Sequence, residues 1–207
     1  MARKSREEAE KTRARILASA LALFARNGYE RTTFNDIAAR LKLTKGAVYW
    51  HFDSKEKLLV ALVDEMVADF QRRLEAVTPR EELSFPVVAK MMIENAKQIV
   101  EHPSSRSAFL FLKTQVRWGE ATMKTVREEF LTNRRFGPFH AFVTAMENDA
   151  RAGRLRDGVD AVEVASAAMA VWDGLVQSRI DGFLTKELTT VLTHTFEAIW
   201  NSIRKVN

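Results

Sequence analysis

Apolar residues recur at the three- and four-residue spacing of an α-helix along most of this chain. No segment alternates apolar and polar residues for long enough to predict a β-strand. The first apolar stripe runs from Ile16 to Phe24, inside a predicted helix over about 7–27. Gly28 follows that helix in the position of a C-terminal cap.

Two short helices are predicted next. Thr33 and Asp36 form a T-x-x-D helix start, which predicts a helix over 34–41. The turn Lys42-Leu43-Thr44 separates it from a second short helix over 45–52, which Thr44 can cap. A longer helix follows over 54–77 and ends at Thr78-Pro79.

The rest of the chain predicts helices at 84–101, 105–117, 120–152, 161–182 and 187–205, with Gly137-Pro138 kinking or splitting the third of these. The predicted fold class is therefore all-α, with about nine helices. Residues 1–53 form a three-helix head with a helix-turn-helix, and 54–207 form a C-terminal helical bundle joined to it through helix 54–77.

Charge is distributed unevenly over the chain. Residues 1–58 carry 13 Lys and Arg against 7 Asp and Glu, a net +6, whereas the remainder carries 19 basic and 20 acidic side chains. A basic segment on a near-neutral body indicates a polyanion as partner. A solvated charged helix face would explain the excess equally well if the charge stood alone.

Two short helices joined by a three-residue turn have the shape of a helix-turn-helix, whose second helix enters the major groove of DNA. Thr44 lies at the positive end of this second helix, where a hydroxyl and free N–H groups bind phosphate. Lys45, Gly46 and Ala47 then offer one donor and two small residues to the groove. Tyr49 and His51 carry polar tips.

These residues resemble the signature of the TetR family of bacterial repressors, over about Thr12 to Leu62. The resemblance rests on Ile37-Ala38, on the run from Thr44 to Phe52 and on Ser54-Lys55-Glu56-Lys57-Leu58. It implies base contacts from Lys45, Gly46, Ala47 and Tyr49, and phosphate contacts from Thr33, Thr44, Tyr49, His51 and Lys55. It also implies a head core of Phe24, Ile37, Ala38, Val48 and Phe52.

Some positions allow more than one interpretation. Family members usually have Gly in the turn where this chain has Lys42, and a left-handed Lys there costs about 1 kcal/mol. Trp50 is interpreted as a packing residue, and a buried core role is the alternative for His51. The basic residues Arg3, Lys4 and Arg6 are either a disordered end or an arm on DNA.

The resemblance also implies a small-molecule pocket among the helices from 84 to 180. Met and aromatic side chains line adaptable apolar pockets, although packing in the core is the ordinary role of each one. The predicted pocket residues are Met92, Phe111, Gln115, Trp118, Phe139, Trp172 and Gln177.

The last two predicted helices carry stripes of small and apolar residues. Such a pair can be internal core, or it can pack against its copy in a second subunit as a four-helix interface, as the resemblance implies. The predicted interface residues are Ala165, Ala168, Trp172, Leu192, Phe196 and Ile199.

The function predicted is that of a transcriptional repressor. A homodimer binds a pseudopalindromic operator in double-stranded DNA, and a small apolar or amphipathic effector relieves binding. A regulator whose solid C-terminal body only dimerises or binds a protein is the alternative. An enzyme is disfavoured, because the four histidines are scattered and no G-x-S-x-G, P-loop or G-x-G-x-x-G motif occurs.

Other classes of site are not expected. The absence of cysteine excludes disulfides and thiolate metal sites, and no metal or cofactor is expected. The apolar run from Ile16 to Phe24 is too short to span a bilayer. With no cleavable signal pattern, we expect a cytoplasmic protein without a membrane partner.

Overall fold

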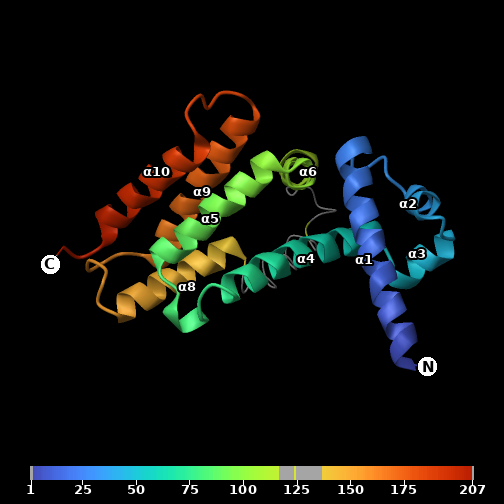
Figure 1. Cartoon of the computed structure of the whole chain (residues 1–207), viewed down its shortest axis with the longest axis horizontal. Helices are drawn as coiled ribbons and strands as arrows, with labels where there is room; N and C mark the ends of the chain where they lie inside the picture. The colour runs from blue at the N-terminus through green and yellow to red at the C-terminus, as the bar shows by residue number, and fades with distance from the viewer. Residues whose placement is uncertain (1, 117–123, 125–136, 207) are drawn as a thin grey trace. The chain divides into compact units, whose positions relative to one another are not determined.

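The computed structural model describes residues 2–116, 124 and 137–206, without the side chains of 2–5 and 115. Over these residues the chain forms nine α-helices and no strand, as the hydrophobic pattern predicts (Figure 1). None of the helices in the described part is long and apolar enough to cross a membrane.

Local capping residues mark the end of the first helix and the starts of the next two. Gly28 adopts a left-handed φ of 91° after the first helix, and Thr33 and Thr44 cap the next two with their side chains. The bounds are α1 Ala2–Asn27, α2 Phe34–Leu41, α3 Lys45–His51 and α4 Lys55–Glu75.

The later helices follow the same logic. Gly137 precedes α8 and Pro138 occupies its first turn, so the predicted break at Gly137-Pro138 is the start of a helix. The predicted helix over 105–117 is shorter and ends in a single π-helical turn. The bounds are η1 Arg80–Glu82, α5 Phe85–Glu101, α6 Pro103–Leu110, η2 Phe111–Gln115, α8 Pro138–Arg151, α9 Ala161–Ile180 and α10 Leu188–Ile203.

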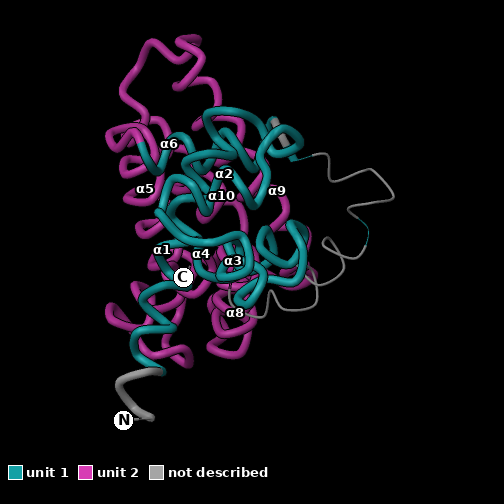
Figure 2. The backbone as a smooth tube through the Cα atoms, turned by 90° about the vertical axis from the view of Figure 1, so that its right-hand side faces the viewer, with its two compact units in different colours: residues 1–66, 104–133 teal, residues 67–103, 134–207 magenta. Residues whose placement is uncertain are grey.

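The chain divides into two compact units (Figure 2). Unit 1 comprises residues 1–66 and 104–133, and unit 2 comprises 67–103 and 134–207. Helix α4 therefore contributes to both units. The boundary predicted between 53 and 54 falls inside unit 1, because the first half of α4 packs with the head.

Each unit has its own aromatic core. In unit 1 the ring of Phe24 stacks on that of Phe111, with centroids 5.4 Å apart, and meets Tyr29 edge-on at 5.1 Å. Phe111 thus joins the head's own core through α1. In unit 2 the ring of Phe85 lies 5.3 Å from that of Phe142 and stacks on Trp200 at 5.8 Å.

A buried carboxylate joins two helices of unit 2. The Asp149 side chain of α8 is fully buried and accepts the backbone N–H of Phe85 at 2.9 Å. The other oxygen of Asp149 accepts a hydrogen bond from Nε of Arg154 at 2.8 Å. The neighbouring Asn148 donates to the carbonyls of Arg80 and Leu83, both at 2.9 Å. Asp149 therefore caps α5, whose own N-cap residue makes no side-chain cap bond.

The stripe predicted for the dimer interface lies inside the chain. Five of its six side chains are at most 5% exposed to solvent in a single copy of the chain: Ala165, Ala168, Trp172, Leu192 and Phe196. The sixth, Ile199, is half-buried. The five buried side chains fill the core of unit 2 and have no exposed surface left to contact a second copy. The prediction was wrong for these five residues, because the spacing of small and apolar side chains does not distinguish the inside of the bundle from the outside, whereas Ile199 stays a predicted interface residue.

Candidate nucleic-acid interface

The turn between α2 and α3 contains the left-handed backbone position that the sequence analysis considered for Lys42. Lys42 adopts a left-handed conformation with φ 56° and ψ 39°, which confirms the strained backbone considered for that position. Its N–H donates to the carbonyl of Ala39, and the N–H of Leu43 donates to that of Ala38 at 2.9 Å. This pair of bonds ends α2 and turns the chain into α3.

Helix α3 divides into an inner and an outer face. Val48 is fully buried, whereas Lys45, Gly46, Tyr49 and Trp50 are exposed together. Positions 45, 46, 49 and 50 adjoin on one side of a helix, so this exposed set, which we call the reading face, is continuous. Ala47, predicted to line base edges, is half-buried beside it.

Trp50 is the member of the reading face that the sequence interpretation missed. Its side chain is 73% exposed, so the interpretation as a packing residue was wrong. The signal was available, because Trp50 follows Gly46 by four residues and must share its side of the helix. The tryptophan places a large apolar ring among the predicted DNA contacts.

Thr44, the N-cap of α3, and Gly46, its second residue, leave the start of this helix open to a ligand. Thr44 accepts the N–H of Ala47 at 3.1 Å, which leaves its own hydroxyl hydrogen free to donate to a phosphate. A Cβ added to Gly46 would meet only Thr44 Oγ1, at 3.9 Å, an ordinary contact distance. Nothing inside the described protein therefore requires glycine at 46.

Thr33 is more constrained than the predicted phosphate contact assumes. Its hydroxyl donates to Asp36 Oδ2 at 2.7 Å, and its N–H donates to the same oxygen at 2.8 Å. The N–H of Asp36 returns a bond to Thr33 Oγ1 at 3.3 Å, which completes a capping box. These bonds from Thr33 lower the pKa of Asp36. The hydroxyl hydrogen of Thr33 is thus already engaged.

Lys55 is also engaged within the head. Its Nζ donates to the carbonyls of Tyr29 at 3.0 Å and Glu30 at 3.3 Å. The same ammonium lies 4.4 Å from the centroid of the Tyr29 ring. Burial, with Glu56 and Glu30 nearby, raises the pKa of Tyr29 above its usual range. Lys55 therefore ties the start of α4 to the loop after α1.

His51 ends α3 in a half-buried position. Burial first, and then the positive charge of Arg13, lower the pKa of His51. The imidazole is therefore neutral at pH 7, and one ring N–H remains as a donor. Its ring stands edge-on to that of Trp50, with centroids 4.6 Å apart.

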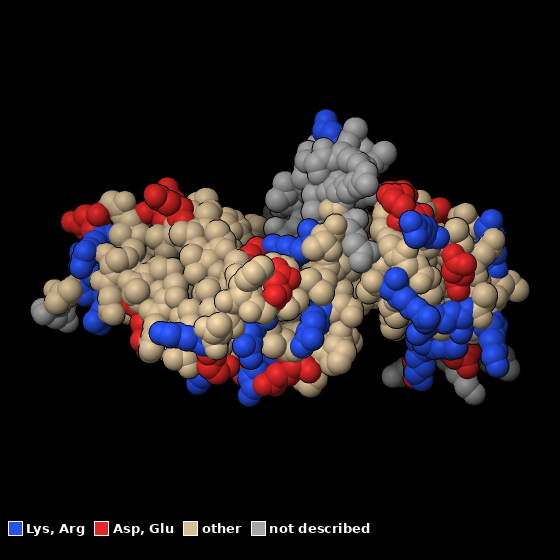
Figure 3. All heavy atoms as spheres, turned by 90° about the horizontal axis from the view of Figure 1, so that it is seen from above, with Lys and Arg blue, Asp and Glu red and all other residues tan. Residues whose placement is uncertain are grey.

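Lys and Arg side chains gather over helices α1–α3 of unit 1 (Figure 3). The sequence assigns this part of the chain its excess of positive charge. Positive charge beside an exposed helix is the electrostatic footprint of a DNA-binding surface.

The described members of the predicted pocket are divided between the two units. Met92 and Trp172 meet in unit 2, where the indole Nε1 donates to the carbonyl of Met92 at 2.7 Å. Phe111 packs in unit 1, and Gln177 bonds to Asp181 one turn along α9 at 2.9 Å. Phe139 is half-buried on α8, whereas Trp118 and the side chain of Gln115 lie outside the described residues.

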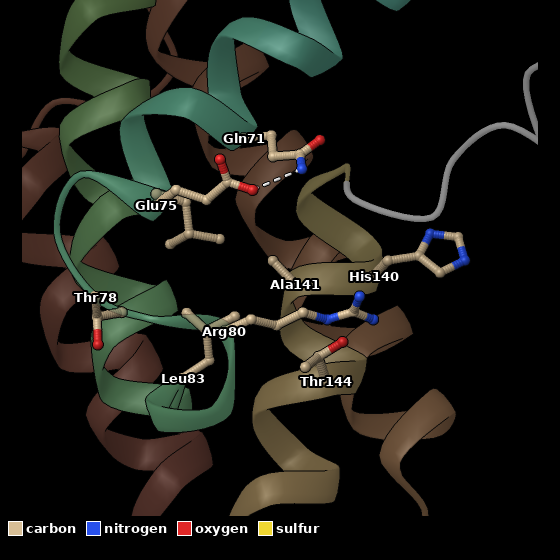
Figure 4. Close-up of a pocket in the computed structure, with 9 residues that line it drawn as sticks. Gln71, Glu75, Thr78, Arg80, Leu83, His140, Ala141 and Thr144 are labelled. Carbon is tan, nitrogen blue, oxygen red and sulfur yellow. Dashed lines mark hydrogen bonds between the residues drawn. The ribbon is translucent and has the colours of Figure 1, made fainter.

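A small crevice opens in unit 2 between the end of α4, η1 and α8 (Figure 4). Its cavity volume is about 30 Å³, and its lining includes Glu75, Arg80 and Thr144. Gln71 Nε2 bonds to Glu75 Oε1 across one turn of α4 at 2.7 Å. This volume is about that of one water molecule and is far below the few hundred Å³ of a drug-sized site.

Comparisons with known proteins agree with the helix-turn-helix. Residues 16–62 match the family model described as bacterial regulatory proteins, tetR family. The chain is 29% identical over 181 residues to the transcriptional regulator TtgR of Pseudomonas putida, covering 86% of this chain and 84% of TtgR.

Solved structures share the whole fold. The complex of SmeT with triclosan superposes with a TM-score of 0.77 at 24% identity, covering 94% of this chain and 92% of SmeT. SmeT is described as the repressor of the multidrug efflux pump SmeDEF of Stenotrophomonas maltophilia. FadR of Bacillus subtilis, solved with stearoyl-CoA, gives 0.74 at 17% identity over 92% of this chain and 98% of FadR. The match of residues 16–62 to the tetR family model, the similarity to TtgR along most of the chain and the shared fold make this chain similar to the TetR-type bacterial transcriptional regulators.

Proposed function

We propose that this regulator represses transcription by binding an operator through the reading face of α3. The main support for the proposal is that position 46 of α3 is glycine, although the described part of the protein has room for a Cβ there. Gly46 is the second residue of α3, where glycine is less stable than alanine by at most about 1 kcal/mol, the value for a helix interior. A closely approaching external surface, such as the floor of a major groove, accounts for its presence.

Gly46→Ala tests this proposal because its two expected effects have opposite signs. The thermal midpoint should rise, since alanine stabilises the helix by up to about 1 kcal/mol. Binding to a duplex enriched from a random library by the wild-type protein should weaken, because the new methyl group occupies the groove. Unchanged binding in the stabilised variant would remove the main support for α3 as the reading helix.

Lys45→Ala provides the second arm of that experiment. Loss of a contact to a guanine edge should weaken the enriched duplex by about 1–3 kcal/mol and relax preference at one or two base pairs. Lys97→Ala is the matched control, because it removes the same charge from an exposed position on α5. Equal loss of binding to enriched and random duplexes would contradict base reading by Lys45.

We propose further that the protein acts as a homodimer through the outer sides of α9 and α10. Both helices carry exposed residues with small side chains there, at Ala167, Ala170 and Gly174 of α9 and Thr190 and Ala198 of α10. Small residues permit close approach of two helix pairs. Ala170→Arg should give a folded monomer by sedimentation, whereas Ala39→Arg on the exposed side of α2 should stay dimeric. A dimeric Ala170→Arg protein would exclude this face.

The effector proposed is a small apolar or amphipathic molecule that binds the DNA-free state more tightly. The support comes from relatives solved with triclosan and with stearoyl-CoA. Both compounds are suitable probes of operator release by the full chain. Release by either, with quenching of tryptophan fluorescence, supports an inducer site. If neither compound releases the operator, and a broader screen of apolar compounds finds none that does, the result favours a regulator whose body only dimerises or binds a protein.

A further inference from the structure

Three side chains from two helices form a stack at the edge of the reading face. Phe34, the first residue of α2, is buried, and its ring meets that of Tyr49 edge-on with centroids 4.8 Å apart at 63°. Lys45, one turn before Tyr49, holds its Nζ 5.5 Å from the centroid of the Tyr49 ring. The contacts therefore run from the interior of the head to a predicted base-reading ammonium.

Tyr49, in the middle of this stack, depends on a contact outside α3 for the orientation of its ring. Tyr49 is 45% exposed on a helix of only seven residues, so little of its ring is held by α3 itself. An edge-to-face contact with a buried ring selects one orientation of the exposed ring. The fixed ring in turn offers its face to the ammonium of Lys45.

Phe34 is itself held in place by the start of α2. The capping box between Thr33 and Asp36 fixes the backbone on both sides of Phe34, and Ile37 anchors the same helix in the core. A rigid support behind a binding group reduces the ordering that must accompany binding. The aromatic ring at 34 is thus placed to transmit the rigidity of α2 to the reading face of α3.

We propose that Phe34 is a positioning residue for DNA recognition, which orients Tyr49 and, through it, Lys45. The inference rests on the proposed function, since it assumes that the reading face binds DNA. Phe34 itself is buried and touches no DNA. Its effect is on how well the two exposed side chains are arranged before DNA arrives.

Phe34→Leu tests the proposal, because it keeps an apolar side chain and removes the ring. Binding of the full chain is measured to a duplex enriched from a random library by the wild-type protein, and to a random duplex of equal length. Affinity for the enriched duplex should fall about 3- to 10-fold, the range that one aromatic pair supplies. Affinity for the random duplex depends on charge, which Phe34→Leu does not alter, so it should change by less than about 2-fold.

A double-mutant cycle separates positioning from general destabilisation. In a Tyr49→Leu background, Phe34→Leu should no longer change affinity for the enriched duplex, although it should still lower the thermal midpoint. Ile16→Val is the matched control, since it truncates a buried side chain of α1 in the same unit and should leave DNA affinity unchanged. Phe34→Met, which also lacks a ring, provides a second variant in case Phe34→Leu does not fold.

The outcomes distinguish the positioning role of Phe34 from the proposed function of the reading face. If Lys45→Ala weakens the enriched duplex but folded Phe34→Leu and Phe34→Met bind like the wild type, the positioning role is wrong and the reading face stands. Additive losses in the cycle would also overturn it. If the wild-type protein enriches no duplex at all, the proposed function and this inference both fall.

Discussion

Lys42→Gly should stabilise the head, although it removes a side chain. Lys42 is exposed and left-handed, with φ 56°, at the end of α2. A left-handed L-residue costs about 1–2 kcal/mol, whereas glycine occupies this region without strain. Glycine also gives the unfolded chain more freedom, which offsets roughly 0.5–1 kcal/mol. The expected net gain is therefore about 0.5–1 kcal/mol.

Arg40→Gly is the matched control for this prediction. Arg40 is exposed two residues earlier, inside α2, so the variant removes the same charge but places glycine in a right-handed helix. That change should cost about 1 kcal/mol. Native-state hydrogen exchange of the Ile37 and Val48 amides in the full chain measures both effects. If the two glycine variants changed protection in the same direction, backbone strain at Lys42 would not be the cause.

Two further predictions concern buried and half-buried charges. Asp149→Ala leaves the N–H of Phe85 without its acceptor and should lower the free energy of unfolding by about 1–3 kcal/mol, measured in urea against the exposed Glu147→Ala. Lys55→Met should lower the thermal midpoint without changing the salt dependence of DNA binding, because its ammonium already bonds to backbone carbonyls. A salt slope smaller by about 0.9 would instead identify Lys55 as a phosphate contact.

The sequence predicted the elements best where the signals are local. The starts of α2 and α3 follow from Thr33 and Thr44, since each caps the amide three residues ahead. The doubtful turn could be located for the same reason, because the left-handed position directly follows a short helix. Such signals depend only on neighbours in the chain, so one sequence contains all the information needed to find them.

Contacts between distant segments were beyond this kind of reasoning. Asp149 caps a helix that begins 64 residues earlier, and Lys55 reaches a carbonyl 26 residues away. Neither residue stands out in its own segment, since an acid near a helix end and a lysine at a helix start are common. The sequence did not identify the buried side of α9 for a related reason. Ala165 and Ala167 offer equally small side chains, and only the packing of other helices decides which of them is inside.

At two positions of α3 and the turn before it, the residue present is not the one that local stability favours. At 42 the backbone is left-handed, which favours glycine, yet the chain carries an exposed lysine. At 46 the backbone is helical and has room for a side chain, which favours alanine, yet the chain carries glycine. Local stability alone would place the opposite residue types at both positions. If the reading face binds DNA as we propose, positive charge at 42 and open space at 46 would both favour that contact, and positions where local rules fail are where functional demands are expected to act.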